Sequence, residues 1–79
     1  MKFKMILETM PGEPRWESDF NTGSVDMAVE YTKRQMVASS VIAAARCNVS
    51  LFNMDANGAF VGVYKLAVPS VVCIEQAAT

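Results

Sequence analysis

The sequence predicts an α+β fold in which an antiparallel sheet of four or five strands packs one face against a single helix. The segment from Ser24 to about Ser40 has helical period, whereas the segments on either side alternate between apolar and polar residues as strands do. Asn57-Gly58 adds a hairpin signal, because both residues tolerate positive φ. The expected element order is ββαββ, with one short further strand near the C-terminal end. The 79 residues fit one domain, 1–79.

The N-terminal part predicts a β-hairpin. Lys2 to Thr9 alternates, with Phe3, Met5 and Leu7 on the inner side, and Arg15 to Phe20 alternates again. The two prolines of Pro11 to Pro14 indicate the turn between these strands. If Met10 pairs near Arg15, the facing pairs are Leu7 with Ser18, Met5 with Phe20, and Glu8 with Glu17.

The central helix is amphipathic at about 100° per residue. Ser24 is the expected N-cap, because its hydroxyl accepts hydrogen bonds from the free amides of the first turn. Asp26 then places negative charge near the positive end of the helix dipole. The helix is expected to end between Ser40 and Ala44, since the run from Val41 to Ala45 fits either a helix or the next strand. The expected buried face consists of Val25, Ala28, Val29, Thr32, Met36, Ser39 and Ala43.

A second hairpin is predicted from Arg46 to Met54 and from Ala59 to Ala67, around the Asn57-Gly58 turn. The return strand is apolar on both faces, so it should be central or covered on its second side. Gly62 indicates a bulge or a close approach of another group. Its alternation places Phe60, Tyr64 and Leu66 on one face, and Val61 and Val63 on the other.

The C-terminal residues leave several possibilities open. The run from Val71 to Ile74 either adds an edge strand, crosses the sheet or pairs with another chain, and Glu75 to Thr79 is expected to be a loose tail. The expected core between helix and sheet consists of Trp16, Phe20, Val29, Met36, Val49, Leu51 and Tyr64.

The composition argues against several classes of function. Seven basic and eight acidic residues give a net charge of −1, whereas nonspecific nucleic-acid binding requires a basic surface. There is no histidine, so a Cys-His nucleophile pair is impossible. The glycines match neither phosphate-loop pattern. We therefore expect no enzyme activity, no catalytic residue, no cofactor, no metal and no direct contact with nucleic acid.

The two cysteines, Cys47 and Cys73, lack the CxxC spacing of a zinc or redox site. We expect them to be reduced and packed as small apolar groups, with a disulfide between them as the alternative. No apolar run is long enough for a signal peptide or a membrane span. The expected location is therefore the cytoplasm, away from membranes.

Two candidate partner-binding surfaces remain. A single helix cannot cover both faces of the sheet, so the C-terminal run, a twin subunit or a different protein should cover the other one. The acidic patch on the first hairpin is either balanced by Lys4 and Arg15 or kept for a basic partner. The acidic patch consists of Glu8, Glu13, Glu17 and Asp19. The apolar patch on the second hairpin consists of Phe52, Val61 and Val63.

In size, architecture and lack of catalytic motifs, the chain resembles the small phage- and prophage-encoded anti-CRISPR proteins. The resemblance covers the whole chain, rests on these general features and transfers no residue role. It implies a monomeric or homodimeric inhibitor in the bacterial cytoplasm that blocks a type I CRISPR-Cas surveillance complex from binding target DNA. The alternatives are a small homodimer that associates through the open sheet face, and an accessory subunit of a larger complex.

Overall fold

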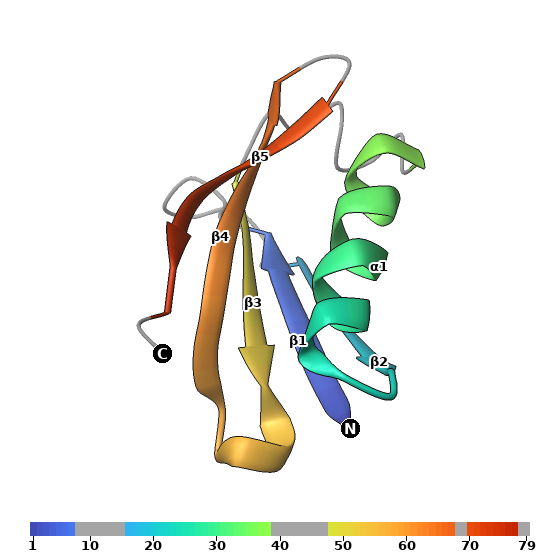
Figure 1. Cartoon of the computed structure of the whole chain (residues 1–79), viewed down its shortest axis with the longest axis vertical. Helices are drawn as coiled ribbons and strands as arrows, with labels where there is room; N and C mark the ends of the chain where they lie inside the picture. Colours follow the sequence, from blue (N-terminus) through green and yellow to red (C-terminus); the bar gives the residue numbers. More distant parts are fainter. Residues whose placement is uncertain (8–15, 39–47, 68–69, 78–79) are drawn as a thin grey trace.

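The computed structural model describes residues 1–7, 16–38, 48–67 and 70–77. One helix packs on one face of a five-stranded antiparallel sheet (Figure 1), which confirms the α+β class. The element order is ββαβββ, because the C-terminal run forms a full strand. The elements are β1 Lys2–Leu7, β2 Trp16–Asn21, α1 Val25–Ala38, β3 Val49–Asn53, the 3-10 turn η1 Met54–Ala56, β4 Ala59–Ala67 and β5 Ser70–Gln76.

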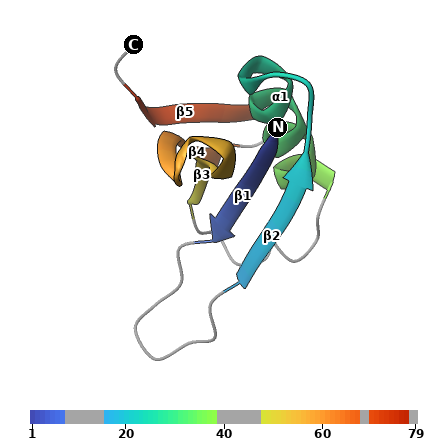
Figure 2. The same ribbon diagram turned by 90° about the horizontal axis from the view of Figure 1, so that it is seen from below.

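The strand order across the sheet is β2-β1-β3-β4-β5 (Figure 2). Strand β1 pairs with both β2 and β3, and β4 lies between β3 and β5, as its two apolar faces predict. The run from Val71 to Ile74 belongs to the edge strand β5. Glu75 and Gln76 also belong to β5, so the expectation of a loose tail is wrong for these two residues.

The core lies between α1 and the sheet. Its predicted members Phe20, Met36, Val49, Leu51 and Tyr64 are buried, which confirms them, while Trp16 and Val29 are partly buried and pack against the core. The sheet face toward α1 is apolar because alternate residues of each strand point to it. The buried apolar residues are Phe3, Met5, Leu7, Phe20, Ala28, Met36, Val49, Leu51 and Tyr64.

The helix begins as predicted. The Ser24 hydroxyl accepts a hydrogen bond from the amide of Met27 at 3.2 Å, which confirms the N-cap. The helix buries Ala28, Thr32 and Met36, and the Thr32 hydroxyl donates to the Ala28 carbonyl at 2.9 Å. Val25, in contrast, is exposed, because it lies in the first turn at the margin of the sheet. Ser39, Ala43 and the ambiguous helix end lie outside the described residues.

The register of the first hairpin differs from the prediction by two residues. Leu7 faces Trp16, Met5 faces Ser18, and Phe3 faces Phe20. This register stacks the rings of Phe3 and Phe20 at 5.7 Å, and it also brings Phe20 to 4.4 Å from the ring of Tyr31 on α1. A shift of two residues keeps every side chain on its expected face. Glu17 consequently faces Ile6 and not Glu8; Glu8, Met10 and Arg15 lie outside the described residues.

A β-bulge changes the faces of β4. Leu51 faces Gly62, but the next residue, Phe52, faces Phe60, so Val61 is the extra residue. Val61 therefore packs against the core, and Phe60 joins Phe52 on the opposite face. The predicted positions of Phe60 and Val61 are both wrong for this reason. The turn itself is confirmed, since Asn57 and Gly58 have φ angles of 56° and 75°.

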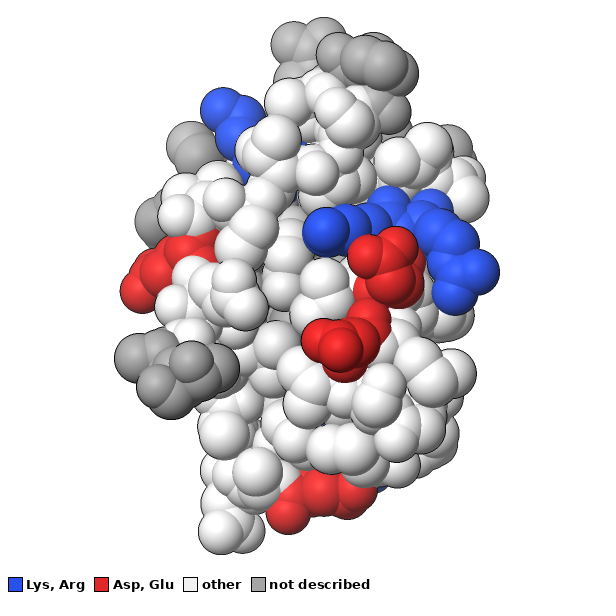
Figure 3. Space-filling model, viewed as in Figure 1, with Lys and Arg blue, Asp and Glu red and all other residues white. Residues whose placement is uncertain are grey.

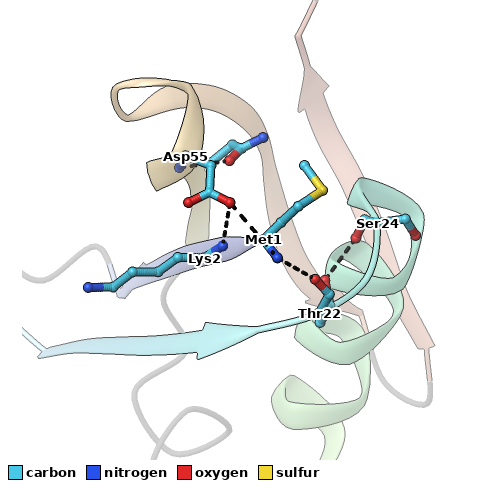
Figure 4. A network of polar contacts seen from close by, with 6 residues as sticks. Met1, Lys2, Thr22, Ser24 and Asp55 are labelled. Carbon is cyan, nitrogen blue, oxygen red and sulfur yellow. Dashed lines mark hydrogen bonds and ion pairs between the residues drawn. The ribbon is translucent and has the colours of Figure 1, made fainter.

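A polar network fixes the start of β1 (Figure 4). The amino group of Met1 donates to the carbonyl of Thr22 at 2.8 Å and lies 3.8 Å from a carboxylate oxygen of Asp55. The amide of Lys2 donates to the same Asp55 oxygen at 3.1 Å. The network ties β1 to the β2–α1 connection and to η1, elements that are distant in sequence.

We expect Met36→Ala to lower the free energy of unfolding by about 2–5 kcal/mol, because Met36 is fully buried and its truncation leaves a cavity. The adjacent Val37 is 57% exposed, so Val37→Ala should change stability by less than about 0.5 kcal/mol. Urea denaturation measures both. Similar losses in the two variants would contradict the assignment of the buried helix face.

We expect Gly62→Ala to lower the free energy of unfolding by about 1–3 kcal/mol. A Cβ at Gly62 would lie 2.8 Å from the Tyr64 hydroxyl oxygen and 3.1 Å from the Glu75 carbonyl oxygen, so the core must shift to admit it. Gly23→Ala is the matched control, because a Cβ there meets only the Met27 sulfur at 3.5 Å. Thermal unfolding of the two variants compares them. Equal stability of both would show that the backbone at Gly62 is not crowded.

Candidate protein-binding surface

The outer face of the sheet, which is the face opposite α1, carries the candidate site. Among the described residues, no helix or strand covers it (Figure 2). Four half-buried apolar side chains lie at its middle, and none of them belongs to the core. We call this group the apolar centre; it consists of Ile6, Phe52, Phe60 and Val63. The Phe52 and Phe60 rings meet edge to face at 6.0 Å.

Strand pairing aligns one complete row of side chains across all five strands. The row begins and ends with a carboxylate on an edge strand, and its interior is uncharged. In strand order its members are Glu17, Ile6, Ser50, Val63 and Glu75. Ser50 is itself 8% exposed, so the neighbouring side chains close over the middle of the row. The arrangement is an apolar centre between two acidic margins.

The acidic margin on β2 is partly balanced. The ammonium nitrogen of Lys4 lies 3.5 Å from a carboxylate oxygen of Glu17, and Lys4 also faces Asp19 directly in the ladder. Both side chains of the ion pair are partly exposed, so it contributes less than about 1 kcal/mol to stability. The structure thus supports the part of the balancing alternative that involves Lys4. The other part, Arg15, lies outside the described residues.

The predicted patches are only partly brought together. Glu17 and Asp19 lie on the outer face beside the apolar centre, and so do Phe52 and Val63. Val61 does not, because of the bulge. Glu8 and Glu13 lie outside the described residues.

Sequence reasoning missed further members of this surface. Phe60 reaches the outer face only through the bulge, and Glu75 had been assigned to a loose tail. Val72 and Ile74 on the edge strand β5 are 45% and 52% exposed and extend the apolar surface toward that edge. The signals available in the sequence were Gly62, which is typical of a bulge, and the apolar run before Glu75.

Cys73 also differs from its prediction. It is a free thiol and exposed, not packed in the core, because β5 is an edge strand and its residues other than Val71 are mostly solvent-accessible. Cys47 lies outside the described residues.

No helix within the described ranges has the length and apolar character that crossing a membrane requires. In the same ranges, His, Cys, Asp and Glu side chains do not gather in groups of three that would suit a metal ion. Neither a known protein family, nor a curated protein, nor a solved structure matches this chain.

Proposed function

We propose that this chain is a protein-binding inhibitor, not an enzyme, and that it docks the outer face of its sheet onto a partner protein. The observation that carries the proposal is the row across the sheet, with an apolar middle and a carboxylate at each edge. Exposed apolar area next to polar margins is typical of protein interfaces, in which buried aromatic groups supply most of the binding energy.

The charges of the outer face favour a partner with basic groups around an apolar surface. In the described residues, neither Asp19 nor Glu75 forms an ion pair, so both carboxylates are available to a partner. The lysines of this face, Lys4 and Lys65, would set the orientation of the complex more than its affinity. Nucleic acid is a poorer fit, since its phosphates would meet a carboxylate at both margins.

Within this class, we propose an anti-CRISPR function against a type I CRISPR-Cas surveillance complex. The proposal is supported by the small size and the α+β architecture, which this chain shares with such inhibitors. The acidic margins suit a Lys/Arg-lined DNA channel, and the apolar centre would hold the inhibitor there. Binding at that place would exclude the target DNA.

Self-association is the second candidate function. The exposed apolar side chains of Val72 and Ile74 lie on an edge strand, and such edges pair readily with another strand. A homodimer would be seen as a concentration-dependent mass in analytical ultracentrifugation, whereas the inhibitor proposal predicts a monomer with its outer face free.

We expect the surface variants to separate the roles of charge and apolar contact in binding the surveillance complex. Asp19→Lys should slow association several-fold at low salt and less at high salt, because mobile ions screen exposed charges. Phe52→Ala should instead speed dissociation by about tenfold, as expected for an aromatic anchor. Surface plasmon resonance at two salt concentrations measures both rates. Val37→Ala, on the exposed side of α1, is the control and should match the wild type.

The function itself is tested by phage or plasmid interference in cells that carry a type I CRISPR system. The wild-type chain should protect the targeted DNA, and Phe52→Ala should protect it less. If the wild type neither binds nor protects across the common subtypes, the anti-CRISPR proposal is wrong. If it protects and both surface variants keep full activity, the outer face is not the binding surface.

A further inference from the structure

A groove of about 280 Å³ lies on the other side of the sheet, between α1 and the strands β4 and β5 (Figure 1). Charged side chains of both signs lie close together over α1, at the margin of this groove (Figure 3). The outer face contributes nothing to the groove, so the groove is independent of the proposed docking surface. Its polar lining consists of Asp26, Glu30 and Lys33 from α1, Tyr64 from β4, and Cys73 and Gln76 from β5.

Tyr64 is the feature that points to a ligand. Its side chain is only 2% exposed, yet its hydroxyl has no hydrogen-bond partner within the described part of the chain. A buried hydroxyl without a partner is costly, and a ligand with an acceptor atom would remove that cost. Burial, and secondly the charge of a nearby Cys73 thiolate, raise the pKa of Tyr64 above its usual value of 10.0. The hydroxyl therefore stays protonated and able to donate at neutral pH.

Cys73 adds a nucleophile to the same groove. Its thiol is free and exposed, and it donates a weak hydrogen bond to the Glu75 carbonyl at 3.3 Å. On α1, half-buried Lys33 offers a cation, and one turn earlier Asp26 and Glu30 offer carboxylates. A ligand that matches all of these groups has a carboxylate for Tyr64 and Lys33, an ammonium group for Asp26 and Glu30, and a sulfur that Cys73 attacks.

We propose that this groove binds small zwitterionic disulfides, of which oxidised glutathione is the model, and that Cys73 forms a mixed disulfide with them. The Cys73 thiol loses its proton, and the thiolate attacks one sulfur of the disulfide. The ligand's S–S bond breaks as the new S–S bond forms. The departing thiolate takes up a proton, so one protein thiol and one disulfide give a mixed disulfide and one free small thiol.

The test uses the full folded chain with oxidised glutathione and, as the matched neutral probe, bis(2-hydroxyethyl) disulfide. Mass spectrometry with peptide mapping follows the product on Cys73 and separates it from any product on Cys47. Each rate is divided by the rate for the same chain in urea, which removes the intrinsic reactivity of the reagent. The folded-to-unfolded ratio should be about tenfold higher for oxidised glutathione than for the neutral disulfide, because charge-assisted hydrogen bonds hold only the former.

Lys33→Ala and Tyr64→Phe should each lower the rate with oxidised glutathione several-fold and leave the rate with the neutral disulfide unchanged. Tyr64→Phe removes only the hydroxyl, and circular dichroism checks that both variants are folded. Equal ratios for the two disulfides in the wild type would overturn the proposal. Rates in the two variants that equal the wild-type rate with oxidised glutathione would also overturn it.

Discussion

One helix can cover only one face of a sheet, and the other features of this domain depend on that constraint. Helix α1 has 14 residues and is therefore about 21 Å long. It encloses one sheet face so fully that Phe3, Leu51 and Met36 are inaccessible to solvent. The remaining apolar residues have no helix to pack against in the described structure. They gather as the apolar centre on the outer face, where a partner would bury them.

Two irregularities in the sheet determine what each face presents. The bulge at Val61 turns Phe60 to the outer face and leaves Gly62 beneath the Tyr64 hydroxyl. A second register shift, between Val63 and Tyr64, makes Ile74 the extra residue of β5. Val63 then faces Glu75 on the outer face, and Tyr64 faces Cys73 toward the groove. The acidic margin and the thiol groove thus come from the same short stretch of two neighbouring strands.

The features that the sequence predicts well are local ones. The Ser24 cap, the Asn57-Gly58 turn and the alternation of β1 each depend on residues close together in the chain, and the structure contains them all. The errors concern pairing between distant residues. The register of the first hairpin follows the stacking of Phe3, Phe20 and Tyr31, which come from three separate elements.

The candidate site was predictable to the same extent. Glu17, Asp19, Phe52 and Val63 follow from alternation and lie where it places them. Phe60, Glu75 and Cys73 depend on the two bulges and on the pairing of β5 with β4. A period of two residues contains no information on where an extra residue interrupts a ladder.

Hydroxyl-radical footprinting of the dilute protein tests the open outer face most directly, because four phenylalanines report on the two faces of one sheet. Phe3 and Phe20 are 0% and 9% exposed, whereas Phe52 and Phe60 are half-buried on the outer face. We predict that Phe52 and Phe60 are oxidised several times faster than Phe3 and Phe20. Equal protection of all four rings would contradict the account, because the outer face would then be covered in the protein alone.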